Sequence, residues 1–133
     1  MISSNFRQNF CFSNPNFLKA SDEEDRKYGI DFWLCNIPVA FRKRRIKCPG
    51  DISIRYQITS GPKTEYYKIL SGVYKAKLFI FEFEDKVIFA KVESIKKALL
   101  NHRFQVIPNK DGKTKGAYIK LENIKFLEWK KEL

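Results

Sequence analysis

Hydrophobic and polar residues alternate along several short stretches of the chain, a pattern typical of β-strands with one buried face. In residues 51–57, Ile52, Ile54 and Tyr56 alternate with polar residues. Residues 76–83 are apolar on both faces at their start, which predicts a central strand covered on both sides. The whole pattern predicts strands over residues 30–34, 38–46, 51–57, 76–83, 86–92, 104–108 and 117–121. The last two strands are joined across Asp111-Gly112, a strong signal for a hairpin turn.

Three further stretches predict helices. The first covers residues 16–27, where Ser21 and Glu24 have the spacing of a capping box and Gly29 ends the helix. The second opens at Ser60-Gly-Pro62 and ends at Gly72, and the third covers residues 94–101.

This order of elements predicts an α+β domain, with a mixed central β-sheet flanked by helices. A chain of 133 residues has the length of one domain, which we place at residues 16–133. Residues 1–15 form an N-terminal arm, which either frays or docks on the domain through Phe6, Phe10 and Phe12. The C-terminal stretch is amphipathic and is expected to cap the core through Phe126, Trp129 and Leu133.

The charge of the chain indicates a polyanionic partner. There are 26 lysines and arginines against 15 aspartates and glutamates, which gives a net charge of +11. Such an excess attracts polyanions, and each phosphate that a lysine or arginine neutralises releases a counterion. Nucleic acid, DNA rather than RNA, is therefore the first candidate partner. A homodimer is left open.

The remaining composition favours a cytoplasmic protein in a reducing compartment. No apolar run reaches the roughly 18 residues that span a membrane, and the N-terminus does not have the pattern of a secretory signal. The odd number of cysteines, at wide spacings, argues against a disulfide framework. No Cys-x2-Cys pair is present, so we expect no zinc site among Cys11, Cys35, Cys48 and His102.

One cluster of residues has the chemistry of phosphodiester cleavage. Asp31 begins one predicted strand, and Arg42 lies on the next. The acidic residues Glu24 and Asp25 precede them on the first helix. Carboxylates of this kind can hold Mg²⁺ or Mn²⁺, which activates water, and a cation can stabilise the charge that develops on phosphorus oxygens.

This layout resembles the PD-(D/E)XK superfamily of nucleases, over about residues 16–84. Gly29-Ile30-Asp31 resembles the family's Asp motif, and the helix Thr64-Glu65-Tyr66-Tyr67-Lys68 falls where the family has its following helix. The resemblance implies a restriction-endonuclease-like fold and a metal-dependent DNA endonuclease. It also implies Asp31, Glu65, Arg42 and Lys68 as catalytic residues and Asp31, Glu24, Asp25 and Glu65 as metal ligands.

The sequence departs from this family at its Glu-x-Lys motif, which reads Ala40-Phe41-Arg42. Ala40 cannot bind a metal, and an arginine remains protonated and cannot act as a base. Glu65 is our candidate for the displaced acid. Simpler roles stay open for these residues, because Asp31 could pair with Arg42 or Arg44 across the hairpin and Glu65 could pair with Lys68 along the helix.

Nucleic-acid binding is expected at two basic stretches. The first is the run between residues 42 and 47, extended by a residue of the next strand, and the second is the tip of the last hairpin. Together they comprise Arg42, Lys43, Arg44, Arg45, Lys47, Arg55, Lys110, Lys113 and Lys115.

Two other functions are compatible with the same residues. The chain could be a catalytically inactive DNA-binding regulator or inhibitor, of the kind carried by mobile elements. It could also be a protein-interaction domain whose positive face meets an acidic protein.

Overall fold

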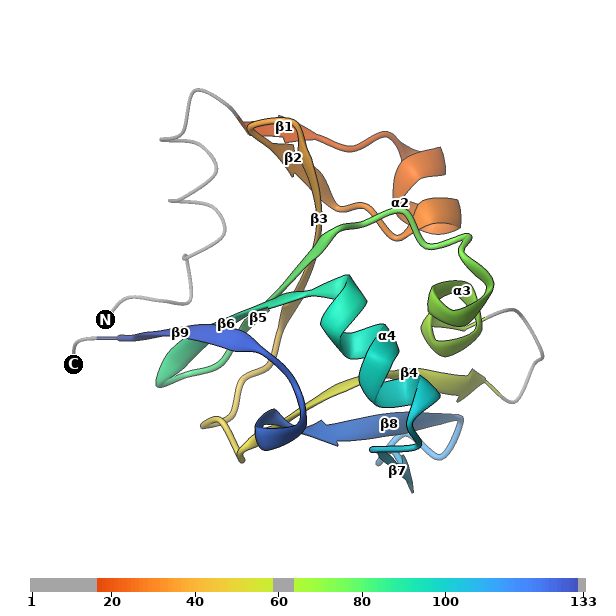
Figure 1. Ribbon diagram of the computed structural model, residues 1–133, viewed down its shortest axis with the longest axis vertical. Helices are drawn as coiled ribbons and strands as arrows, with labels where there is room; N and C mark the ends of the chain where they lie inside the picture. The colour runs from red at the N-terminus through yellow and green to blue at the C-terminus, as the bar shows by residue number, and fades with distance from the viewer. Residues whose placement is uncertain (1–16, 59–63, 132–133) are drawn as a thin grey trace.

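The computed structural model describes residues 17–58 and 64–131, which form two β-sheets and three α-helices (Figure 1). The large sheet has six strands in the order β1-β2-β3-β5-β6-β9, and only β3 and β5 run parallel. Its strands are β1 (Phe17–Lys19), β2 (Phe32–Leu34), β3 (Ile37–Lys43), β5 (Leu78–Glu82), β6 (Lys86–Lys91) and β9 (Phe126–Lys130).

The small sheet is antiparallel and has three strands in the order β4-β8-β7. These strands are β4 (Asp51–Ile58), β8 (Thr114–Lys120) and β7 (Gln105–Pro108). The helices are α2 (Asp22–Tyr28), α3 (Glu65–Ser71) and α4 (Val92–Leu100), and a short 3-10 helix, η2 (Leu121–Asn123), follows β8. In the described part of the chain, no helix has the length and apolarity required to cross a membrane.

The main core lies on one side of the large sheet, where α3, α4 and the small sheet pack against it (Figure 1). Phe79 and Phe81 of β5 point into this core, with stacked rings 4.3 Å apart. They meet Ile52 and Ile54 of β4 and Leu99 of α4, which are at most 1% exposed. A second, smaller cluster lies on the opposite face of the sheet and contains Phe32, Val39, Ile80 and Val87. Strand β5 is therefore central and apolar on both faces, as the sequence predicted.

The α+β class, with a mixed central sheet, is confirmed, and so are several local signals. Ser21 and Glu24 form the predicted capping box, and Gly29 ends α2 in the left-handed conformation. Gly72 ends α3 in the same way. Asp111 accepts hydrogen bonds from the backbone N–H groups of Lys113 and Thr114, which shapes the predicted hairpin turn.

Three expectations were wrong. The first helix begins at Asp22 rather than at residue 16, because residues 17–19 pair with β2 and Ser21 caps the helix. Strand β4 does not join the central sheet. It pairs with β8 after the chain turns at Gly50, where φ is 89°.

The third wrong expectation concerns the C-terminal stretch. It forms the edge strand β9, and Trp129 is 48% exposed and does not cap the core. Phe126 does pack against the core. The N-terminal arm, the opening of the second helix at Ser60-Gly-Pro62, and Leu133 all lie outside the described residues.

Candidate functional site

Glu65 is the centre of a polar network that joins α3 to both sheets. It is the first residue of α3, and its Oε2 lies 2.6 Å from Nη2 of Arg42 on β3. Its Oε1 accepts a hydrogen bond of 2.9 Å from the backbone N–H of Arg55 on β4. The hydroxyl of Tyr74 donates to Oε2 at 3.4 Å. Both carboxylate oxygens therefore have protein donors.

Arg42 is held as a structural cation. Its Nη1 donates to the carbonyl oxygen of Ser53 at 3.2 Å, and its guanidinium lies 5.7 Å from the centre of the Phe79 ring. Burial by itself lowers the pKa of Arg42, but the charge of Glu65 and its hydrogen bond outweigh this effect, so the pKa is raised. Burial, followed by the charge of Glu65, raises the pKa of Tyr74 well above its ordinary value. Tyr74 therefore stays neutral and keeps its donor proton.

Asp31 lies immediately before β2 and faces β3. Its Oδ2 accepts a hydrogen bond of 2.6 Å from the backbone N–H of Phe41, and its own N–H donates to the carbonyl oxygen of Val39. The charge of Asp31 also helps to raise the pKa of Arg42. The charges of Glu65 and Asp31 thus both act on the guanidinium of Arg42.

The other predicted catalytic and metal-binding residues have separate contacts. Lys68 does not pair with Glu65, because its Nζ donates to the carbonyl oxygen of Arg26 at 2.8 Å. Glu24 completes the cap of α2 and accepts a hydrogen bond of 3.1 Å from Nε1 of Trp33. The backbone hydrogen bond from Ser21 is the main reason why the pKa of Glu24 is lowered. Asp25 is exposed on α2.

The contacts of Glu65 leave it poorly suited to ligate a magnesium or manganese ion. Such ions need several carboxylate or carbonyl oxygens with free lone pairs, whereas Glu65 already accepts three hydrogen bonds and faces the positive charge of Arg42. Among the described residues, no group of three or more His, Cys, Asp or Glu side chains could hold a metal ion. The catalytic roles of Asp31, Glu65, Arg42 and Lys68 therefore stay predictions that this geometry does not favour.

The Glu65→Gln variant tests the structural role of this network. Glutamine keeps the size of the side chain but removes the negative charge that Arg42 and Arg55 contact. We expect a loss of about 2 kcal/mol in the free energy of unfolding, the usual value for hydrogen bonds to a charged group. Urea unfolding would measure it, with the exposed Glu84→Gln variant as the matched control. Equal stability of the two variants would show that the Glu65 network is dispensable.

The predicted nucleic-acid-binding residues differ in their contacts and in their exposure. Arg42 and Arg44 both turn toward Ser53, whose hydroxyl accepts a hydrogen bond of 3.0 Å from Arg44 Nη1. Arg55, which is expected to extend their face, donates its backbone N–H to Glu65, the ion-pair partner of Arg42. Its charge also acts on Asp111 at the tip of the last hairpin. The remaining predicted residues are exposed, at the end of β3, on the segment after it or on that hairpin: Lys43, Arg45, Lys47, Lys110, Lys113 and Lys115.

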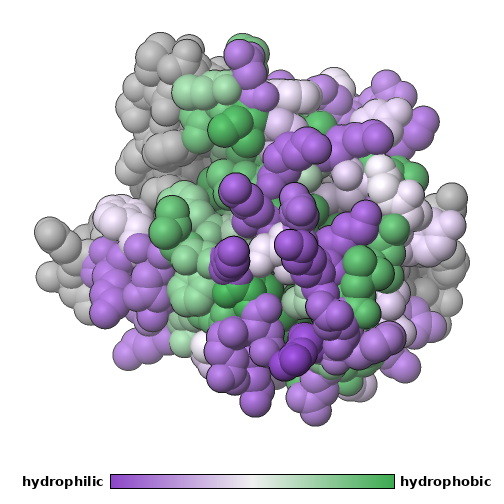
Figure 2. Space-filling model, in the orientation of Figure 1, coloured by the Kyte–Doolittle hydropathy of each residue, from purple (hydrophilic) through white to green (hydrophobic). Residues whose placement is uncertain are grey.

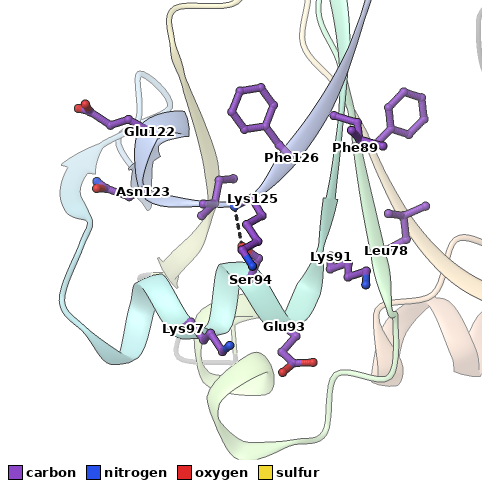
Figure 3. Close-up of a pocket in the computed structure, with 12 residues that line it drawn as sticks. Leu78, Phe89, Lys91, Glu93, Ser94, Lys97, Glu122, Asn123, Lys125 and Phe126 are labelled. Atoms are coloured by element: carbon purple, nitrogen blue, oxygen red, sulfur yellow. Dashed lines mark hydrogen bonds between the residues drawn. The ribbon is translucent and has the colours of Figure 1, made fainter.

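The structure brings a different set of basic residues together, at the end of the large sheet where α4 begins. Two adjoining hollows of about 680 and 1000 Å³ lie there and share Leu78, Lys91, Glu93 and Lys97 in their linings. We call them together the lysine groove. Figure 2 shows hydrophilic side chains gathered around α4 on this face, and Figure 3 shows the part of the groove near β9. Its six lysines are Lys75, Lys77, Lys91, Lys96, Lys97 and Lys125.

The charge of the lysine groove is not balanced locally. Its acidic lining residues are Glu93 and Glu122. Within residues 17–58 and 64–131, the ion pairs are Arg42–Glu65, Lys86–Glu128 and Lys131–Glu82, and none involves a groove lysine. Lys75 donates to the carbonyl oxygen of Gly72 at 3.3 Å. Five of the six lysines are exposed, and Lys96 is half-buried. The groove is thus a concave, positively charged surface that is open to a ligand.

Comparison with known protein families, curated proteins and solved structures finds no match to this chain. The resemblance to PD-(D/E)XK nucleases, and with it the restriction-endonuclease-like fold, stays a prediction.

Proposed function

We propose that this protein binds nucleic acid through the lysine groove. The observation that carries the proposal is the convergence of six lysines, without an ion pair among the described residues, on one concave surface. Like charges gathered in this way repel one another, and a polyanion relieves the repulsion when it binds. Nucleic acid gains in addition from the release of its condensed counterions.

Two features favour nucleic acid over the other polyanionic partners. A membrane surface is broad, so it would reach the rim of the groove but not its interior. The net charge of +11 acts over the whole chain, which suits a long, uniformly charged ligand better than a single acidic segment of a protein. DNA is the form of nucleic acid that we would test first.

Exchange of two groove lysines for glutamine, in the Lys91→Gln/Lys97→Gln variant, tests the proposal. If both lysines contact phosphates, the slope of log affinity against log salt concentration should become shallower by about 1.8 for duplex DNA or about 1.4 for single-stranded DNA. Fluorescence anisotropy with a labelled DNA over a salt series would measure the slope. The matched control is the Arg45→Gln/Lys47→Gln variant, which loses the same charge from the exposed segment after β3. An equal or larger effect of the control would move the interface to that segment.

The same protein and DNA test whether the chain also cleaves. Parallel incubations with Mg²⁺, Mn²⁺ or a chelator should give retarded but intact DNA, because Glu65 is engaged by Arg42, Arg55 and Tyr74. Metal-dependent products that disappear in the Asp31→Ala variant would instead establish the nuclease hypothesis. Failure to bind any nucleic acid at low salt would favour an acidic protein partner.

A further inference from the structure

A row of apolar side chains crosses the large sheet beside the lysine groove. Leu78 of β5 pairs with Lys91 of β6, and Leu127 of β9 pairs with Phe89 of β6. Because side chains alternate along each strand, Leu78, Phe89 and Leu127 lie on one face of the sheet. Val39 of β3 is the partner of Leu78 and therefore points to the same face. Ile37 lies two residues before Val39, so its side chain is on this face as well. We call these four residues the apolar row.

The apolar row lines the same hollows as the lysines. Ile37 and Leu78 line the larger hollow, and Leu78, Phe89 and Leu127 line the smaller one. Figure 3 shows Leu78 and Phe89 on one side of the strands, near Lys91. Ile37 is 44% exposed and Leu127 is 75% exposed. Leu78 and Phe89 are half-buried and pack against the smaller core cluster, so only part of each side chain adds to the exposed surface of Ile37 and Leu127. Exposed apolar surface that is rimmed by charges is characteristic of ligand-binding sites.

From this juxtaposition we infer that the ligand is single-stranded nucleic acid. The inference rests on the proposed function and adds its substrate class. The lysines contact phosphates, and the apolar row contacts the faces of unpaired bases. Proteins that bind single strands combine a basic groove with aromatic side chains on which bases stack. Phe89 is the aromatic member of the row, and Ile37, Leu78 and Leu127 add aliphatic surface beside it.

A duplex would use only half of this surface. Its bases are stacked on one another, so a protein that binds outside the grooves of DNA meets mainly sugars and phosphates. The apolar row would then stay in water beside the bound duplex. A single strand offers phosphates and free base faces together, which matches the lysines and the row at once.

The experiment compares three labelled or competing ligands: a single-stranded DNA, the blunt duplex of the same sequence, and inorganic polyphosphate of similar charge. The variants are Leu127→Asn and Phe89→Leu, and Leu18→Asn is the control. Leu18 is 64% exposed on β1, at the opposite edge of the sheet, and does not line either hollow. Thermal unfolding of each variant would verify that it is folded at the temperature of the binding assay.

We expect the unchanged protein to bind the single strand at least tenfold more tightly than the duplex. Leu127→Asn and Phe89→Leu should each weaken single-strand binding about five- to tenfold, at the lower end of what a base contact contributes. They should leave the salt slope and the polyphosphate affinity unchanged, and Leu18→Asn should change nothing.

Failure of this inference and failure of the proposed function would give different results. Equal affinity for single strand and duplex, with no effect of the two variants, would refute base contacts but keep nucleic-acid binding by the lysines. Inorganic polyphosphate that competes as well as the single strand would reduce the groove to a general anion site. The absence of binding to all nucleic acids at low salt would refute the proposed function itself.

Discussion

The Lys131→Met variant is expected to lose about 3–5 kcal/mol of the free energy of unfolding, the usual cost of leaving a buried charge without its partner. Lys131 Nζ lies 2.9 Å from Glu82 Oε2, and the two side chains are 2% and 1% exposed. The same ammonium group donates to the carbonyl oxygen of Phe83. Without this ammonium group, the carboxylate of Glu82 would remain in the interior with no cation. The loss would add to an existing cost, because Glu82 Oε1 has no hydrogen-bond partner among the described residues.

Urea unfolding would measure the loss, and the Lys130→Met variant is the matched control. Lys130 is the neighbouring residue and is exposed, so its replacement should change stability by less than about 0.5 kcal/mol. A double variant, Glu82→Met/Lys131→Met, should recover most of the lost stability, because replacing both members of a buried ion pair removes the uncompensated charge. If Lys131→Met unfolded at the same urea concentration as Lys130→Met, the buried pair would contribute nothing to stability.

Local signals were sufficient to predict the elements whose cause lies within a few residues. Glu24 reaches back to Ser21 because a capping box is complete within one turn of helix. Strand β5 could be recognised because its run of apolar residues has no polar face, and such a strand must be covered on both sides. The cap is predictable because the residues that form it are close in sequence. The strand is predictable because its composition is compatible only with a buried position.

The elements that were missed depend on distant partners. Strand β1 is only three residues long, too short for a periodic pattern, and pairing with β2 determines its conformation. Strand β9 carries apolar residues at positions 126, 127 and 129, which resemble one face of a helix as much as a strand. Its pairing with β6 decides between them. The division into two sheets follows from the pairing of β4 with β8, more than 50 residues further along the chain.

The candidate site was predicted only in part, because its contacts also join residues that are far apart in the sequence. Glu65 and Arg42 were both identified, but the sequence offered Lys68 or a metal as partners of Glu65, and the ion pair joins residues 23 positions apart. The lysine groove was missed because its six lysines are spread over residues 75–125 in ones and twos. The compact basic run between residues 42 and 47 was more conspicuous in the sequence. In the structure, however, Arg42 and Arg44 of this run turn toward Ser53. One signal was available, since Lys97 lies opposite the apolar face of α4 and Lys96 lies at the side of that face.

Gly29→Ala is expected to be nearly as damaging as the loss of Lys131, for a steric reason. Gly29 has a φ of 72° at the end of α2, and a left-handed conformation costs a residue with a Cβ about 1–2 kcal/mol. The new Cβ would also overlap the ring of Tyr74. Overpacking of this kind adds about 1–3 kcal/mol, so we expect a total loss of about 2–5 kcal/mol in the free energy of unfolding.

Tyr74 has little freedom to yield to the new methyl group. Its ring is stacked on Phe79, with 6.3 Å between the ring centres, and its hydroxyl donates to Glu65 Oε2. Gly72→Ala separates the two costs, because Gly72 has a φ of 84° but nothing lies within 4 Å of its new Cβ. Urea unfolding of both variants should therefore show a clearly larger loss for Gly29→Ala, and the difference measures the resistance of Tyr74 to displacement. Equal losses would mean that the ring moves aside freely, and its contacts with Phe79 and Glu65 would then not hold it in place.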